Sequence, residues 1–208
     1  MACILHIDSS PRGDRSMSRT LSKEFIDAWK DSHPDDTIEY RDLGHNPVPH
    51  VNEQWIAAAF TPPDSHTPEL KAAIKISDEL VDRFLRSDRY VFGIPMYNFN
   101  VPSTFKAYID QIVRPNRTFA VDENGNYRGL VDSSKKMLII VSQGSSFKPE
   151  TPLAAYDFQV PYLRTVFGFL GITDVTVICA DNMNQGPELK AQSLADARAK
   201  IQELASSW

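Results

Sequence analysis

The sequence predicts an α/β fold in which a doubly wound parallel sheet carries helices on both faces. Short apolar runs alternate with longer helix-period patterns from one end of the chain to the other, as expected of parallel strands joined by crossover helices. The 208 residues, 42% hydrophobic and 24% charged, suit a globular domain large enough for a full core. We therefore predict a single domain, residues 1–208, built on five parallel strands.

The five strands are expected where the apolar runs are compact and bounded by polar residues. They are residues 3–8, 37–42, 89–94, 136–142 and 175–179. Five helices fill the intervals between them because apolar side chains there recur every three to four positions. They are residues 18–31, 70–85, 103–113, 154–169 and 188–205.

Two segments depart from this alternation. Residues 44–68 are rich in Pro, His and Thr around a short apolar helix-like piece at 55–60, which we interpret as a lid or an association element. Residues 117–131 contain Glu123-Asn124-Gly125-Asn126 between two short apolar runs, and Asn-Gly is a strong hairpin turn signal. A hairpin excursion beside the sheet is therefore expected, either functional or simply covering hydrophobic surface.

Charge and composition argue against several classes of protein. The net charge is −5 and no block of Lys or Arg is present, which disfavours binding to nucleic acid. The N-terminal run becomes polar too early for a signal peptide and no run reaches the length of a membrane span. Cys3 and Cys179 each lie in an apolar run, which predicts small buried core residues in a reducing compartment. We expect a cytoplasmic protein without a membrane segment.

In an open α/β sheet, ligands bind beyond the carboxyl ends of the strands, so the loop after the first strand is a candidate ligand-binding segment. Residues 9–18 carry four serines before a helix. Hydroxyls and unpaired N–H groups at a helix N-terminus attract anions. The loop has neither the glycine spacing of a P-loop nor that of a dinucleotide-binding turn, so a single terminal phosphate is expected. Alternatively, Ser18 is an ordinary helix N-cap and the other serines are solvated.

The loop after the third strand is unusually apolar. Met96, Tyr97, Asn98 and Phe99 lie between two prolines, whereas turns are normally built from small polar residues. Apolar side chains for a ring face and amides for its edge would suit a planar heteroaromatic ligand. Alternatively, Asn100 caps the following helix and the aromatic residues belong to the core.

The loop after the fourth strand contains Ser142, Gln143, Gly144 and Ser145. Its glycine would allow the backbone to approach a ligand closely. One loop thus suits a phosphate, one a flat ring and one backbone contacts. Together the three loops describe a site for a mononucleotide with a large planar head.

These residues resemble the FMN-dependent NADH-azoreductase family, flavodoxin-like flavoproteins that also act as NAD(P)H:quinone reductases. The resemblance rests on Ser9-Ser10, Ser16-Met17-Ser18, the 95–100 segment, Ser142-Gln143-Gly144 and residues 168–174. It implies the strand order 2-1-3-4-5 and an FMN phosphate at Ser10 and Ser16 to Ser18. It also implies a ring lined by Met96 to Phe99 and bordered by Ser142 to Ser145. Many relatives carry two glycines where this chain has Gly144-Ser145.

The resemblance also implies a homodimer with the flavin between subunits, walled by the two excursions. The expected activity is two-electron transfer from NADH or NADPH to quinones and azo compounds by a ping-pong mechanism. Flavin supplies the redox chemistry, so no metal is expected and no side chain is assigned a catalytic role. The sequence decides neither the donor nor the acceptor.

Three other functions are weighed against this one. A flavodoxin-type electron carrier would bind FMN without a small-molecule substrate of its own. A hydrolase would use Asp8 or one of His6, His45, His50 and His66, which lack metal-binding spacing. A non-enzymatic interaction protein would use the apolar loop as a docking patch.

Overall fold

Five apolar runs form one parallel sheet in the computed structural model, which describes residues 1–208. The strands are β1 (Cys3–Asp8), β2 (Thr37–Asp42), β3 (Arg89–Pro95), β6 (Lys136–Ser142) and β7 (Asp174–Ala180). Their order is β2-β1-β3-β6-β7, and every neighbouring pair is parallel. Counting only these five strands, the order is the expected 2-1-3-4-5.

The central strands are continuous apolar runs because both faces of the sheet are covered by helices. In β6, all five residues from Met137 to Val141 are buried, and in β3 burial extends from Tyr90 to Pro95. β2 and β7 form the edges of the sheet and are only partly buried.

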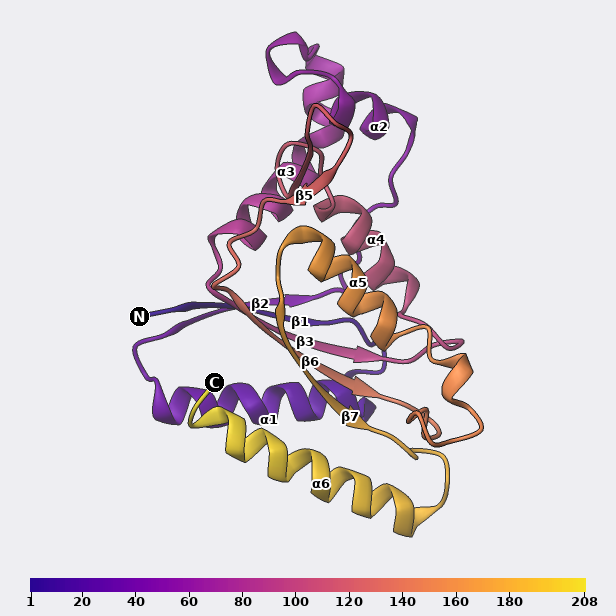
Figure 1. Ribbon diagram of the computed structural model, residues 1–208. Helices are drawn as coiled ribbons and strands as arrows, with labels where there is room; N and C mark the ends of the chain where they lie inside the picture. The colour runs from indigo at the N-terminus through magenta and orange to yellow at the C-terminus, as the bar shows by residue number, and fades with distance from the viewer.

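Two helices cover one face of the sheet and three cover the other (Figure 1). α1 (Met17–Ser32) and α6 (Pro187–Ala205) share one core with the sheet. α3 (Pro68–Arg86), α4 (Ser103–Ile112) and α5 (Val160–Leu170) form the larger core on the opposite face. The predicted amphipathic pattern of α1 is confirmed, since Leu21, Phe25, Ile26 and Trp29 are all buried.

The expected helix at 154–169 is divided into two pieces. A 3-10 turn, η3 (Ala154–Tyr156), is followed by α5 from Val160. The division follows from Asp157, whose Oδ1 accepts hydrogen bonds from the N–H groups of Gln159 at 2.9 Å and Val160 at 3.0 Å. A carboxylate that binds these N–H groups starts a new helix.

The two excursions lie together near α3, on the face of the sheet that α3, α4 and α5 cover and on the side of these helices away from the strands (Figure 1). α2 (Glu53–Phe60) begins at Asn52, whose side chain accepts from the N–H of Trp55, and packs on α3. A second 3-10 turn, η2 (Pro63–Ser65), follows α2. The hairpin is confirmed as β4 (Phe119–Val121) and β5 (Tyr127–Gly129), an antiparallel pair outside the main sheet.

The prediction that both cysteines are buried is wrong. Cys3 is half-buried and Cys179 is exposed, and both thiols are free. Cys179 lies on the edge strand β7, where its side chain borders an open groove between α5 and α6. An apolar run on an edge strand therefore does not guarantee burial of each member. None of the helices is long and apolar enough to span a membrane.

Candidate functional site

Four loops at the carboxyl edge of the sheet surround a cavity of about 290 Å³. They follow β1, β3, β6 and β7, whose carboxyl ends lie at the same edge (Figure 1). This is where the topology of a doubly wound sheet places a ligand. The cavity is lined by Ser10, Arg12, Arg15, Ser16, Met17, Pro95, Met96, Tyr97, Ser142, Gln143, Gly144, Met183, Asn184 and Lys190.

One end of the cavity is equipped for an anion. Helix α1 begins at Met17, preceded by a 3-10 turn, η1 (Gly13–Arg15). The N–H groups of Met17 and Ser18 have no partner within the chain, and such free donors at a helix N-terminus favour negative charge. The hydroxyls of Ser16 and Ser18 lie 3.1 Å apart. Ser18 is therefore not the helix N-cap; that position is Ser16, whose side chain makes no capping hydrogen bond.

Three cations also line the cavity: Arg12, Arg15 and Lys190. Two of them belong to the loop of residues 9–18, the serine loop, and the third lies at the start of α6. Guanidinium and ammonium groups are the usual side chains that bind phosphate. The anion end thus combines hydroxyls, backbone donors and positive charge.

Contacts with the end of β2 and the residues that follow it stabilise the serine loop. Arg19 donates from Nε to the carbonyl of Ser10 at 2.7 Å and pairs through Nη2 with the carboxylate of Asp42. Asp42 also binds the ring of His45 at 2.7 Å and accepts from the N–H of Gly44 at 3.0 Å. A side chain at position 44 would clash with Ser10, because its Cβ would lie 2.2 Å from the Ser10 carbonyl oxygen.

These contacts perturb the two ionisable groups at the centre of this support. Burial would raise the pKa of Asp42, but hydrogen bonds from Arg19 and His45 outweigh it and lower the pKa to about 2. Burial and the nearby Asp8 carboxylate raise the pKa of Tyr40 to about 12. Asp42 is thus a carboxylate, and Tyr40 a neutral phenol, throughout the physiological range.

The other end of the cavity is formed by a tight turn after β3. Tyr97 and Asn100 exchange backbone hydrogen bonds of 2.8 and 3.0 Å, and Asn98 and Phe99 between them have φ of 47° and 68°. Positive φ at both central positions is typical of a type I′ turn, and it leaves the N–H groups of these two residues without intrachain partners. The N–H of Met96 is bonded to the Ser142 carbonyl at 2.8 Å.

The alternative interpretation of this loop is wrong. Helix α4 has Pro102 as its N-cap, and the Asn100 side chain instead accepts from the N–H of Val101. Phe99 is 46% exposed and Tyr97 is half-buried, so these aromatic residues are not core. The loop presents flat apolar surface because of its turn, as expected of a binding element.

The loop after β6 is tied to the loop after β7. Asn184 donates from its N–H to the carbonyl of Gly144 at 2.9 Å, and a Cβ at position 144 would lie 2.8 Å from Asn184 Nδ2. Glycine here allows the close approach of Asn184, whose side-chain amide would have to shift to make room for a larger residue. Ser145 is turned toward Gln185, whose Nε2 donates to the Ser145 hydroxyl at 2.8 Å.

Most of the predicted site residues meet in this cavity. Its walls include Ser10, Ser16, Met17, Met96, Tyr97, Ser142, Gln143 and Gly144. Four predicted residues lie beside it without forming its wall: Ser18, Asn98, Phe99 and Ser145. The predicted site residues did not include the three cations or the loop after β7, with Met183 and Asn184. Applying the rule of carboxyl ends to the fifth strand as well would have found that loop.

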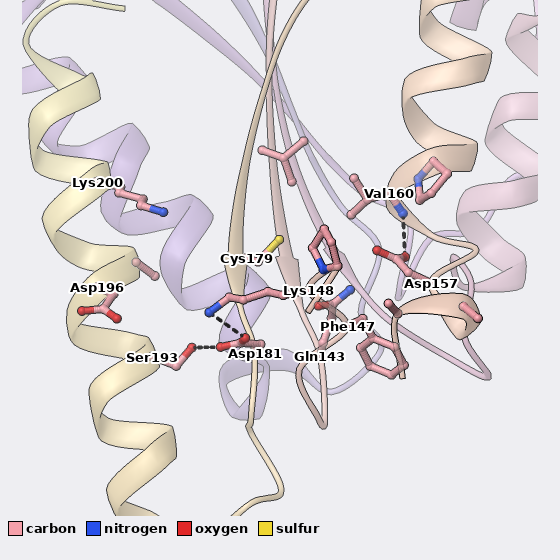
Figure 2. A pocket seen from close by; sticks show the side chains of 16 residues that line it. Gln143, Phe147, Lys148, Asp157, Val160, Cys179, Asp181, Ser193, Asp196 and Lys200 are labelled. Carbon is pink, nitrogen blue, oxygen red and sulfur yellow. Dashed lines mark hydrogen bonds and ion pairs between the residues drawn. The ribbon is translucent and has the colours of Figure 1, made fainter. Parts of the chain in front are cut away.

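Two larger cavities, each of about 730 Å³, lie elsewhere. One runs beside β7 between α5 and α6, where Lys148 pairs with Asp181 at 3.2 Å (Figure 2). The other lies between α1 and β2 and contains His6 and Asp8. The Asp8 carboxylate there accepts from Ser22 and Tyr40. None of the histidine, cysteine or carboxylate groups forms a metal-binding cluster of three.

The sheet order defines a flavodoxin-like protein, with this cavity at the carboxyl edge of its sheet. Residues 2–205 match the family described as flavodoxin-like fold. The chain is 67% identical to FMN-dependent NADH:quinone oxidoreductase 2 of Trichormus variabilis and 64% identical to FMN-dependent NADH:quinone oxidoreductase of Nostoc punctiforme, in both cases over 208 residues and 100% of each chain. It belongs to the family of FMN-dependent NADH:quinone oxidoreductases and azoreductases.

Solved structures agree with this assignment. The azoreductase from Bacillus anthracis str. Sterne superposes with a TM-score of 0.92 at 26% identity, over 100% of both chains. The FMN-dependent NADH-azoreductase from Bacillus anthracis str. Ames Ancestor, solved in complex with FMN, gives a TM-score of 0.89 at 27% identity. That comparison covers 99% of this chain and 98% of the other.

Proposed function

We propose that this protein is an FMN-dependent oxidoreductase that passes two electrons from NADH or NADPH to quinones and azo compounds. The observation that carries the proposal is the single cavity that joins an anion end to an apolar ring end at the carboxyl edge of the sheet. The family assignment supports the same function, since its members named above depend on FMN.

The residues that line the cavity, together with the four that lie beside it, fit the parts of FMN. Ser10, Ser16, Met17 and Ser18 would hold the phosphate, assisted by the neighbouring cations. The turn of Met96, Tyr97, Asn98 and Phe99 would line the isoalloxazine ring, and Ser142, Gln143, Gly144 and Ser145 would border its pyrimidine edge.

When bound, FMN would supply the redox chemistry between the nicotinamide donor and the acceptor, and the protein would bind, orient and tune it. The free N–H groups of the 98–99 turn and the backbone at Gly144 are donors for the ring edge. Donor and acceptor occupy the same open face in turn, which gives ping-pong kinetics. No side chain is assigned a catalytic role.

We further propose a homodimer in which the excursions of each subunit complete the cavity of the other. A volume of about 290 Å³ lies at the lower end of the range for small-molecule pockets, so additional walls are expected. Both excursions expose large apolar side chains: Ile56 at 50%, Phe60 at 73%, Val121 at 51% and Tyr127 at 67%. Sedimentation should give twice the chain mass, and Phe60→Asp should give monomers. A monomeric wild-type protein would refute this arrangement.

Absorbance and anaerobic reduction test the function. The purified protein, or the protein mixed with FMN, should be yellow, and NADH or NADPH should bleach it without oxygen. A quinone or an azo dye should restore the colour. A protein that does not quench FMN fluorescence at micromolar concentration would refute the proposal. A protein that binds FMN but is not reduced by either donor would be an electron carrier instead.

We also propose a cytoplasmic location, consistent with two free thiols and a nicotinamide donor. Cell fractionation would test it, and recovery of the protein outside the cytoplasm would contradict it.

A further inference from the structure

We infer that Gln159 is a positioning residue for the ring end of the cofactor cavity, a role that rests on the proposed flavin function. Gln159 is fully buried and does not line the cavity itself. Its Nε2 donates to the carbonyl of Ile94 at 3.3 Å, at the end of β3. Its Oε1 accepts from Nε2 of Gln143 at 3.4 Å, in the loop after β6. One amide thus connects the ends of β3 and β6. The first carries the ring loop, residues 96–99, and the second carries the pyrimidine-edge loop, residues 142–145.

The residues on either side of Gln159 strengthen this connection. The N–H of Phe158 donates to the carbonyl of Phe99 at 3.1 Å. Phe99 is the residue at φ 68° in the ring loop, a conformation that a bulky side chain adopts only where the surroundings hold it. Asp157 accepts from the N–H groups of Gln159 and Val160 and so fixes the start of α5; Figure 2 shows Asp157 and Val160 joined in this way, with Gln143 nearby.

Residues 157–159 therefore support the ring end of the cavity. Phe158 is hydrogen-bonded to the turn that contains Phe99, and Gln159 is hydrogen-bonded both to the end of β3 and to the loop after β6. Both polar atoms of the Gln159 side-chain amide are buried, and an unmade hydrogen bond is costly there. Loss of the amide would let the two walls of the ring end separate, although no group that contacts the ring would be removed.

The first test is Gln159→Leu, which has similar volume and neither hydrogen bond. We expect the Kd for FMN to rise about tenfold, because the ring end would no longer be held in its binding geometry before FMN binds. The rate of anaerobic flavin reduction at saturating FMN and NADH should also fall. The matched control is Ile201→Ala, which opens a cavity in the core formed by α1 and α6 on the other face of the sheet. It should lower the melting temperature and leave the FMN Kd unchanged.

The second test is Gln159→Glu, which remains informative if the leucine variant does not fold. A protonated carboxyl can donate one hydrogen bond and accept another, as the amide does, whereas a carboxylate only accepts. The charged and titratable groups around this segment are Asp157 within it and, on neighbouring elements that line the same groove, Lys148, Cys179 and Asp181. Asp157 is the one bonded to residue 159, and burial beside another carboxylate raises a carboxyl pKa. Relative to wild type at each pH, FMN binding by this variant should be weak at about pH 8 and recover toward about pH 5.

The outcomes separate this inference from the proposed function. A wild-type protein that does not bind FMN refutes the function. A wild-type protein that binds FMN, together with Gln159→Leu that keeps its Kd and reduction rate, refutes the positioning role alone. A constant ratio of affinities between Gln159→Glu and wild type across pH would refute it as well.

Discussion

Replacing Asp42 with Asn should weaken both the fold and the support of the serine loop. Asp42 lies at the end of β2, and its side chain is 18% exposed. Its carboxylate pairs with Arg19, binds His45 and accepts two backbone N–H groups. Asparagine keeps the shape and one acceptor oxygen but removes the charge, so the pairing with Arg19 is lost and Arg19 is freer to leave the Ser10 carbonyl.

The magnitude follows from the pKa of Asp42, which is lowered from 3.8 to about 2 in the folded protein. The difference corresponds to about 2 kcal/mol of unfolding free energy at neutral pH. Because the folded pKa lies below the unfolded one, this stabilisation is complete above about pH 5 and is lost as the pH falls through about 2. At pH 7 the variant should therefore melt roughly 4–8 °C lower than wild type.

Urea unfolding of the apoprotein, followed by circular dichroism at several values between pH 7 and pH 3, measures this effect. The difference in unfolding free energy between wild type and Asp42→Asn should become smaller as the pH is lowered toward 3. Asp27→Asn is the control, because Asp27 forms an exposed pair with Lys23 and such pairs contribute little. If the difference in unfolding free energy is the same at pH 7 and pH 3, or is absent at pH 7, the charge of Asp42 does not stabilise its contacts with Arg19 and His45.

Three further substitutions test other contacts of the structure. Gly44→Ala should weaken FMN binding and lower stability, because the added Cβ would lie 2.2 Å from the Ser10 carbonyl oxygen; unchanged titrations of FMN fluorescence would contradict this. Gly144→Val should weaken FMN binding at least about tenfold, since a side chain there meets Asn184 at 2.8 Å, and equal affinity by the same titration would remove the argument for close approach. Trp208→Ala should cost about 3 kcal/mol of unfolding free energy without altering FMN binding, because this 6% exposed indole packs against aromatic rings far from the cavity; urea unfolding within error of wild type would contradict its core role.

Much of the fold could be predicted because its signals are local. The spacing of apolar residues within one segment predicts the helices and buried strands, and the Asn-Gly turn predicts the hairpin. The one divided helix was missed because its break depends on Asp157 binding two N–H groups, which residue spacing does not reveal. The exposed Cys179 was missed because an apolar run does not state whether its strand lies at the centre or the edge of the sheet.

The candidate site was predicted to the level of its loops. The serines after β1 and the apolar turn after β3 carry their chemistry in a few adjacent residues, so the sequence alone pointed to an anion and a planar ring. The loop after β7 lies at the cavity because β7 is next to β6 in the sheet, and nothing in its own residues identifies Asn184 as the neighbour of Gly144.

The sequence by itself determined the doubly wound sheet, the loops that meet at its carboxyl edge and, through resemblance, the flavin family. The tertiary structure decided which side chains face the cavity and what holds its walls. Gly44 against Ser10, and Gln159 against Ile94, join residues 34 and 65 positions apart. Such contacts depend on how separate elements pack, and packing is a property of the whole fold and not of any one segment.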